Sequence, residues 1–494
     1  MATRTIYLSE FLKRNAAGDC LVVFEGGVYN LTAFQKIHPG GPLVIDHLKG
    51  KNATDAIYAY HPSDVIAKRL PNFFLGRLAD DGVDSGIESD ETSEDGALEE
   101  PPANRLVVPM TRVEKAGGAV GYGALVSDTE ISRDFRKLHQ KLEELGFFET
   151  DKSFYIREVL KFAACIAIII YTGIFAPRHI LSYIACAFTT AFLWQQSAFV
   201  GHDIGHTSVL RSSKWDYILG TTVGNALLGF SIGWWKSSHN VHHIVTNSPE
   251  HDSDIQHLPF FAVSTRLMSK VYSSYYNVTW DFPNDKFAQL MISVQHYSYW
   301  PILCFGRFFL YLQSVKHLVT SDWCPYRYWE ACTMLVFLSW QAFLISHFHS
   351  WTGIALYVFM SHALTMILHL QITVSHYSMS TADAPENEDW ATKALRTSLD
   401  VECPKWLDWF HGGLQFQVEH HLFPRIARQR LREVRPYVAD FAARHGLELH
   451  TQSFVEGNMR TFRNFKAVAE FAEQAGFAWG RIGGKKINVA TKLE

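Results

Sequence analysis

The sequence predicts a multi-domain fold: a small α+β domain, an acidic linker, and an all-α integral membrane domain with about four transmembrane helices and a cytosolic helical cap. Three observations support this prediction. Residues 6–79 combine short apolar runs with glycine-rich turns, as in a compact α+β unit. A strongly acidic stretch follows. Beyond it lie four apolar runs of about 20 residues, each long enough to cross a bilayer.

The overall composition narrows the possible functions. The net charge is -4 and acidic and basic residues are intermixed outside the linker, so nothing favours binding to nucleic acid. The seven cysteines are odd in number and widely spaced, which favours free thiols in a reducing compartment. The first residues carry no apolar h-region, so we expect no cleaved signal peptide and attribute membrane insertion to internal segments.

Two histidines of the first domain are placed to hold a haem. His38 lies in a loop where Gly40 and Gly41 remove side-chain bulk, and His61 follows Tyr60. Two such imidazoles can bind a haem iron from opposite sides, which leaves no open position and favours electron transfer over oxygen binding. His47 lies between them without a motif, and we expect a surface histidine there.

This stretch resembles cytochrome b5. The match covers Val28–Thr32, Phe34, His38–Gly41, Asn52–Ala56, His61 and Phe74–Arg77. The resemblance implies a haem b with His38 and His61 as its axial ligands.

Residues 80–125 are expected to form a disordered acidic linker. Ten acidic residues fall between 80 and 102, with almost no large apolar side chains to bury. Like charges extend such a chain, and some forty flexible residues span on the order of 35 Å. The haem domain could therefore reach a neighbouring site at high effective concentration.

Residues 126–445 are predicted to form the membrane domain, and residues 446–494 a cytosolic tail. The predicted spans are 159–176, 180–200, 328–348 and 354–372. Two further apolar stretches, 217–235 and 299–315, are predicted to be interfacial. The second interfacial stretch contains Arg307, whose charge is costly inside a bilayer. Three histidine clusters that share one site must lie on one side of the membrane, so an even number of spans separates each pair. This argument leaves four spans.

Basic residues predict the orientation of these spans. Lys152, Arg157 and Lys161 precede or begin the first span, whereas the loop between the last two spans has no Lys or Arg. Positive residues favour the cytosolic side. We therefore expect both termini and the histidine clusters to face the cytosol.

Three histidine clusters carry the chemistry. Their members are His202 and His206, then His239, His242 and His243, then Gln417, His420 and His421. Positions i, i+3 and i+4 share a helix face, so each cluster can aim its side chains at one point. Seven imidazoles exceed the four ligands of a tetrahedral zinc but suit two irons that keep open positions for dioxygen. Gln417 is a weaker donor, and either direct ligation or hydrogen-bonded support stays open for it.

His376 is a candidate additional ligand. It lies at the cytosolic end of the fourth span, and His362 and His369 precede it at seven-residue intervals on nearly the same helix face. His369 would lie about 10 Å deeper in the membrane, too far for the same iron pair. We therefore include His376 among the metal ligands and leave the other two out.

Together with the haem unit, these motifs resemble the membrane fatty-acyl and sphingolipid desaturases, specifically the front-end class with a fused cytochrome b5. The resemblance implies that each clustered histidine binds one of two non-haem irons. Segments that look most like delta-8 sphingolipid desaturases are His239–Asn247, Asp254–Pro259, Leu370–His376 and Arg396–Pro404.

The resemblance also implies a reaction and partners. The expected enzyme is an oxidoreductase that uses O2 and electrons from its cytochrome b5 domain to desaturate a membrane lipid, either a ceramide or long-chain base or an acyl lipid. A separate cytochrome b5 reductase would supply electrons from NADH. The expected location is the endoplasmic reticulum membrane, and the oligomeric state stays open.

Other functions remain possible at this point. A delta-6 or delta-5 fatty-acyl front-end desaturase shares the histidine clusters, and the same two irons could hydroxylate instead. A non-catalytic membrane carrier of electrons would use the histidines to bind more haems. About two non-haem irons and one haem per chain would favour the desaturase over that carrier.

Overall fold

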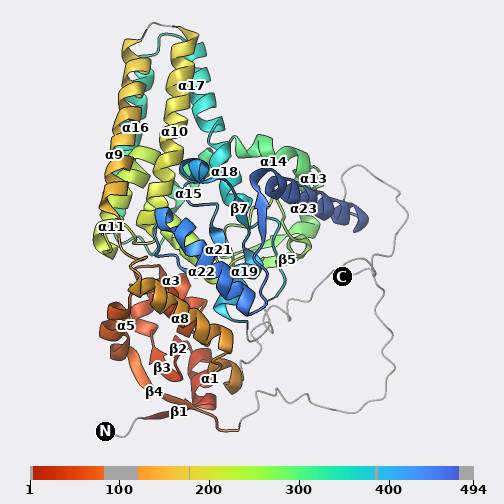
Figure 1. The fold of residues 1–494 in the computed structure, drawn as a ribbon. Helices are drawn as coiled ribbons and strands as arrows, with labels where there is room; N and C mark the ends of the chain where they lie inside the picture. The colour runs from red at the N-terminus through yellow and green to blue at the C-terminus, as the bar shows by residue number, and fades with distance from the viewer. Residues whose placement is uncertain (1–3, 83–120, 177–178, 384–387, 478–494) are drawn as a thin grey trace.

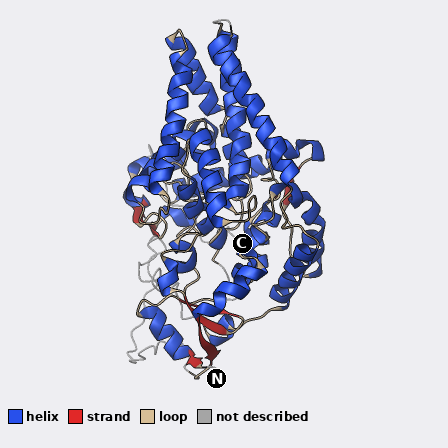
Figure 2. Ribbon diagram, turned by 90° about the vertical axis from the view of Figure 1, so that its left-hand side faces the viewer, coloured by secondary structure: helices blue, strands red, loops and turns tan. Residues whose placement is uncertain are grey.

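The computed structural model describes residues 4–82, 121–176, 179–383 and 388–477. The N-terminal domain lies at one end of the molecule, and four long helices, α9, α10, α16 and α17, project at the other (Figure 1). Helices α19, α21 and α22 lie between these two parts. Most of the chain is helical, and strands form the N-terminal sheet and two small pairs elsewhere (Figure 2).

The N-terminal domain is built on a four-stranded sheet in the order β1-β4-β3-β2, with β1 parallel to β4 and the other pairs antiparallel. Its strands are β1 (Thr5–Tyr7), β2 (Leu21–Phe24), β3 (Gly27–Asn30) and β4 (Phe74–Ala79). Its helices are α1 (Leu8–Ala16), α2 (Thr32–Gln35), α3 (Pro42–Asp46), α4 (Thr54–Tyr60) and α5 (Ser63–Arg69). Glu25 and Gly26 both take positive φ in the two-residue turn between β2 and β3, the geometry that matches the twist of a tight hairpin.

The predicted linker is partly ordered at its end. Most of residues 80–125 lie outside the described residues, but Tyr122–Leu125 form the short helix α7, and Leu125 is buried against Ile6 and Phe11. The prediction of disorder is therefore wrong for these last residues. Helix α8 (Glu130–Glu144) follows, and its N-terminus is capped by the Thr129 hydroxyl, which accepts a hydrogen bond from the Ser132 backbone.

Three helices among the described residues are long and apolar enough to cross a membrane: Lys152–Phe175, Arg327–Ser346 and Trp351–Thr373. They comprise α9 (Lys152–Ile170) with a π-helical turn (Tyr171–Phe175), α16 (Arg327–Ser346), and α17 (Trp351–Ala363) with α18 (Met366–Thr373). The remaining predicted span, 180–200, lies in α10 (Ile180–Gly205), which is longer but not among the three. Its last turns contain the buried Gln195, Gln196 and Asp203, which shorten its apolar part.

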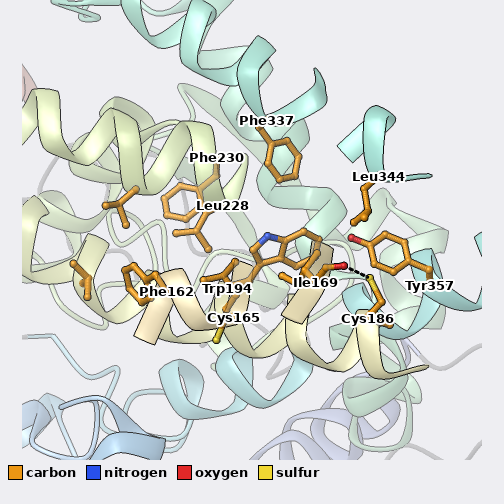
Figure 3. Packing of buried hydrophobic residues seen from close by; sticks show 14 of the residues in the cluster. Phe162, Cys165, Ile169, Cys186, Trp194, Leu228, Phe230, Phe337, Leu344 and Tyr357 are labelled. Carbon is orange, nitrogen blue, oxygen red and sulfur yellow. Dashed lines mark hydrogen bonds between the residues drawn. The ribbon is translucent and has the colours of Figure 1, made fainter. Parts of the chain in front are cut away.

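These helices share one apolar core. Trp194 of α10 lies at its centre, fully buried among Leu228, Phe337 and Tyr357 (Figure 3). Its indole N–H donates to the Leu227 carbonyl at 3.2 Å, so the large ring is buried without leaving its donor unsatisfied. Other apolar side chains of the same helices point outward and are exposed, as lipid-facing residues would be: Val159, Leu160, Phe188, Leu335, Phe343 and Phe359.

The two stretches predicted as interfacial are broken into shorter helices. They contain parts of α11 (Ser213–Gly220), a π-helical segment (Thr221–Leu228), α12 (Ile232–Ile244), α14 (Gln295–Leu303) and α15 (Gly306–Thr320). Arg307, expected at a surface, is only 2% exposed. Its guanidinium lies 3.6 Å from the centroid of the Trp194 ring, donates to the Tyr311 hydroxyl at 2.7 Å and also donates to the Leu228 carbonyl. These partners replace water and allow its burial.

The C-terminal part completes the second domain. Its elements are α13 (Lys286–Ser293), α19 (Trp390–Thr397), α20 (Asp408–His411), α21 (Gln417–Leu422), α22 (Leu431–Arg444) and α23 (Phe454–Gln474), with strand pairs β5 (Lys270–Ser273) and β6 (Val278–Asp281), and β7 (Asp400–Glu402) and β8 (Thr451–Ser453). The 3-10 turns are Leu70–Phe73, Thr265–Met268, Phe282–Asn284, Lys405–Leu407 and Arg428–Arg430. Residues 451–474 of the predicted tail pack on the second domain: β8 pairs with β7, and Phe465 is fully buried.

Candidate functional site

The first group of imidazoles brings together the three histidine clusters. His202 and His206 come from the end of α10, His239 from α12 and His420 from α21. One ring nitrogen from each lies within 4.8 Å of those of the others. Helices far apart in sequence therefore point four neutral donors at one small volume, an arrangement suited to a transition metal.

The second group lies beside the first. It consists of His242, His376 and His421, whose ring nitrogens are also within 4.8 Å of one another. His243 lies between the two groups: its Nε2 atom is 3.1 Å from Nε2 of His239, and its ring stacks on that of His421 with centroids 4.2 Å apart. All eight predicted imidazoles thus meet at one place.

Residues around the imidazoles fix their orientation. Asp252 is fully buried, and one of its carboxylate oxygens accepts hydrogen bonds from His242 Nδ1 at 2.9 Å and the Asn247 backbone N–H at 2.7 Å. The Nδ1 atom of His376 lies 3.1 Å from the Thr397 carbonyl. Anchoring one ring nitrogen leaves the other free for a metal, so these contacts prepare His242 and His376 for ligation.

Several buried ring nitrogens have no hydrogen-bond partner among the described residues. They are Nε2 of His202, His206, His420 and His421, and Nδ1 of His243. Buried polar atoms are normally paired, so this cluster of unpaired donors fits metal ions. Burial, and then the neighbouring imidazoles, hold the pKa of His206, His243 and His420 well below the ordinary value, which keeps these rings neutral and able to donate a lone pair.

Gln417 lies at the edge of the second group. It is the first residue of α21, is buried, and hydrogen-bonds the His376 side chain. It also lines a small cavity with His202, His420 and Gly412. Gly412 has φ of 60°, and a Cβ there would collide with the Phe199 ring, so glycine allows this loop to approach α10 closely.

His362 and His369, which were not expected to bind the metals, belong to neither group. The ring of His362 stacks on Phe308 at 4.5 Å and meets Trp194 edge-on at 5.2 Å, and His369 packs against Gly306. These contacts belong to the helix core, where the sequence placed them.

The N-terminal domain contains a second candidate site. The rings of His38 and His61 face each other with centroids 6.1 Å apart. An iron about 2 Å from one nitrogen of each ring would place the centroids roughly 6 Å apart, so the spacing fits a haem iron between them. Nδ1 of His61 donates to the Ile57 carbonyl at 3.0 Å, which leaves Nε2 of that ring for the iron, whereas Nδ1 of His38 accepts a hydrogen bond from the Gly40 backbone N–H at 3.2 Å.

Sequence comparisons give these sites a family. The fatty acid desaturase model matches residues 178–453, and the model of the cytochrome b5-like haem/steroid binding domain matches residues 7–79. The chain belongs to the fatty acid desaturase family. It is therefore an oxidoreductase, with a haem domain of the cytochrome b5 type at its N-terminus and a helical desaturase domain after it.

Its curated relatives align over nearly the whole desaturase. A Delta 8-(E)-sphingolipid desaturase of Kluyveromyces lactis is 36% identical over 95% of this chain and 93% of that protein. One of Komagataella phaffii is 35% identical over 92% of this chain and 91% of its own. The Delta(8)-fatty-acid desaturase 1 of Arabidopsis thaliana is 33% identical over the same shares, 92% and 91%.

The haem domain of this desaturase is docked against the histidine site. Val44 and Ala56 pack on Val241, Ile244 and Val245 of α12. The Asn240 side chain donates to the Gly40 carbonyl at 3.1 Å. The docked position places His38 near the face of α12 that contains Asn240, and His239 and His242 take part in the imidazole groups from the same helix.

Helix α8 forms the other side of this interface. Arg136 pairs with Asp55 of the haem domain at 2.7 Å, and the Ser132 hydroxyl donates to the same carboxylate at 2.5 Å. Ser63, two residues after His61, donates to Glu143 at 2.7 Å. His47, expected at the surface, instead meets His251 across the interface with ring centroids 5.0 Å apart.

A buried charge cluster next to the first group was missed from the sequence. Arg428 pairs with Asp203 and, at 3.1 Å, with Glu158, and the Tyr155 hydroxyl donates to Asp203 at 3.0 Å. It joins α9, α10 and the segment after α21, and Asp203 is adjacent to His202. The only indication of this charge cluster in the sequence is Asp203 between His202 and His206, because its partner Arg428 lies 225 positions away.

Proposed function

We propose that this chain is a delta-8 sphingolipid desaturase that inserts a double bond into the long-chain base, with electrons from its own haem domain. The single observation that carries the chemistry is the meeting of eight imidazoles, seven in two adjacent groups and His243 between them, beside the docked haem domain. The substrate class is supported by the relatives from yeasts, which are delta-8 sphingolipid desaturases over almost the same length.

The two imidazole groups would hold two irons. His202, His206, His239 and His420 would bind one, and His242, His376 and His421 the other, with His243 between them. Gln417 would support the second iron, either as a ligand through its amide oxygen or through its hydrogen bond to His376. His38 and His61 would hold haem b.

The bound irons would supply the oxidising power to break two unactivated C–H bonds with dioxygen. Two adjacent CH2 groups would lose one hydrogen atom each, which together supply two protons and two electrons. Two further protons and two further electrons would complete the reduction of O2 to two waters. The haem domain passes those two electrons one at a time. A separate reductase that uses NADH would reload the haem.

Helix α21, which contains His420 and His421, lies between the long helices and the haem domain (Figure 1). Lys152, Arg157 and Lys161 lie in the first turns of α9. We propose a multi-pass protein of the endoplasmic reticulum membrane with its active site and both termini in the cytosol. Its four spans would be α10 and the three long apolar helices.

Expression in a yeast without delta-8-unsaturated long-chain bases tests this function. Mass spectrometry of long-chain bases and fatty acids should reveal a new double bond in the long-chain base. New double bonds only in fatty acids would instead support the acyl alternative, the substrate class in the name of the Arabidopsis thaliana relative.

Variants separate the two proposed cofactors. His242→Ala should abolish the product and leave the haem spectrum unchanged, whereas His38→Ala should remove the haem. His347→Ala, at a half-buried histidine just beyond the end of α16, is the matched control and should retain activity. Product from His242→Ala at the wild-type level would overturn the metal assignment.

A further inference from the structure

Arg425 is a buried cation without an anionic partner. It follows α21, its side chain is 8% exposed, and its guanidinium lies 5.4 Å from the centroid of the Phe148 ring. Within the described residues it has no ion pair and no hydrogen bond to another side chain or backbone group. Since desolvating an unpaired charge is costly, a guanidinium in this position indicates a missing anion.

The acidic residues near Arg425 are occupied elsewhere. Glu143 accepts the hydrogen bond from Ser63 at 2.7 Å, and Asp64 lies on the surface 3.5 Å from Lys68. Arg211, the nearest other cation, is paired with Glu149 at 2.6 Å. Burial, and then the charge of Arg211, lower the pKa of Arg425 to about 10, which still leaves it protonated at neutral pH.

Arg425 lies where the haem domain meets the desaturase domain. Ala59 of the haem domain belongs to the same apolar cluster as Phe148, Phe423 and Ile426. His61 is close enough to Arg425 for the positive charge to contribute to its lowered pKa, after burial. The unpaired cation therefore faces the domain that would hold the haem.

Both rims of the haem crevice touch the second domain. The loop after His38 contacts Asn240 of α12 through Gly40, and the segment after His61 contacts Glu143 of α8 through Ser63. A haem held between the two imidazoles would carry two carboxylates on one edge, and the desaturase domain adjoins the segments that follow both imidazoles. A guanidinium binds a carboxylate with two parallel hydrogen bonds, better than any other side chain.

We propose that Arg425 of the desaturase domain binds a haem propionate carboxylate across the domain interface. The proposal rests on the proposed assignment of haem to His38 and His61. The haem then becomes part of the interface, so that the loaded haem domain docks more firmly than the empty one. No acidic residue of the chain needs to neutralise Arg425, because the cofactor supplies the charge.

The test compares two haems in the full-length protein. Wild type and Arg425→Gln are reconstituted with haem b or with its dimethyl ester, in which both propionates are uncharged, and the rate of haem transfer to excess apomyoglobin is measured. Arg425→Gln should lose haem b roughly tenfold faster than wild type, as expected for one lost charge-assisted pair. With the dimethyl ester the two proteins should release haem at the same rate.

Further variants keep the test decisive. Arg425→Lys retains the charge but not the fork of donors, and should give an intermediate rate for haem b. Arg211→Gln removes a neighbouring cation that already has a partner, and should match wild type. Equal effects of Arg425→Gln on both haems, or none on haem b, would overturn the proposal. A wild-type protein that binds no haem would instead overturn the haem assignment itself.

Discussion

The ring of Tyr60 meets the ring of His243 edge-on, with centroids 6.1 Å apart and planes 87° to each other. Tyr60 is adjacent in sequence to His61, and His243 lies between the two imidazole groups. The Tyr60 hydroxyl is buried without a hydrogen-bond partner among the described residues, and the contact with His243 is made by the ring. One aromatic side chain therefore connects the proposed haem ligand to the proposed irons.

Replacement of Tyr60 by Leu should slow electron transfer out of the haem. Loss of the ring lengthens the gap to His243, and we expect reoxidation of the reduced haem by the desaturase domain to be roughly tenfold slower, equal to about 1.4 kcal/mol on the barrier. Stopped-flow absorbance of the haem in the presence of O2 and substrate measures this rate.

Two variants serve as controls for this prediction. Tyr60→Phe retains the ring and should behave as wild type. Tyr58→Leu removes a tyrosine of the same helix that hydrogen-bonds Glu25 at 2.8 Å and is not in contact with His243. If Tyr60→Leu and Tyr58→Leu slow the haem equally, the ring contact has no special role.

Replacement of Asp252 by Ala should weaken metal binding at the second group. The Asp252 carboxylate orients the His242 ring through a hydrogen bond. Burial alone would lower the pKa of His242, but the charges of Asp252 and Asp254 raise this pKa above its ordinary value. Loss of such an orienting partner typically costs 10–100-fold in metal affinity, so iron per chain should fall by about half at limiting iron. Mass spectrometry of bound metal measures this, with Asp281→Ala, at a surface ion pair of 3.9 Å, as the control.

The ion pair between Asp55 and Arg136 should hold the haem domain in its docked position. Both side chains are largely buried, and Ser132 also bonds the carboxylate. A double-mutant cycle of the two alanine variants should give a coupling of about 1–3 kcal/mol in the docking equilibrium. Spin labels at Lys68→Cys and Arg463→Cys, both on exposed surface of different domains, report the docked fraction as a distance distribution. Additive effects of the two single variants would exclude a direct coupling.

Docking of the haem domain should weaken in mild acid. Burial, then His251, Lys51 and Lys393, lower the pKa of His47 to about 3, and burial lowers that of His251 despite the nearby Glu250. The docked state therefore favours neutral rings, while undocked histidines titrate near their ordinary value of 6.5. The undocked state binds more protons between these values, so docking is complete above about pH 6.5 and is lost as the pH falls below it.

The same spin-label distances at about pH 7.5 and pH 5.5 test this dependence. His47→Gln removes one of the two rings and should reduce the change between the two pH values. A wild-type docked fraction that is equal at both pH values would contradict the role of the histidine pair.

The parts of the site that follow from local spacing could be predicted from the sequence. The i, i+3 and i+4 positions of His239, His242 and His243 place them on one helix face, and the seven-residue interval singled out His376. Their division into two groups could not be predicted, because it depends on how α10, α12 and α21 pack. The same limit applies to Arg428 and to the buried Arg307, whose partners lie far away in the chain.

The docked position of the haem domain also could not be predicted from sequence patterns. An acidic linker indicates how far a domain can move but not where it rests. The docked position depends on apolar contacts of Val44 and Ala56 with α12, and these residues look like ordinary core positions of a small domain. Helix α23 was missed for a similar reason: its buried Phe465 packs on elements that are distant in sequence.

Helix α12 contributes residues both to the interface with the haem domain and to the imidazole groups. Asn240, Val241 and Ile244 contact the haem domain, and His239 and His242 take part in the two imidazole groups. A separate cytochrome b5 that used this surface would have to displace the tethered domain, whose effective concentration is on the order of millimolar. The desaturase is thus insulated from the shared pool of electron carriers, and its rate follows the loading of its own haem rather than their abundance.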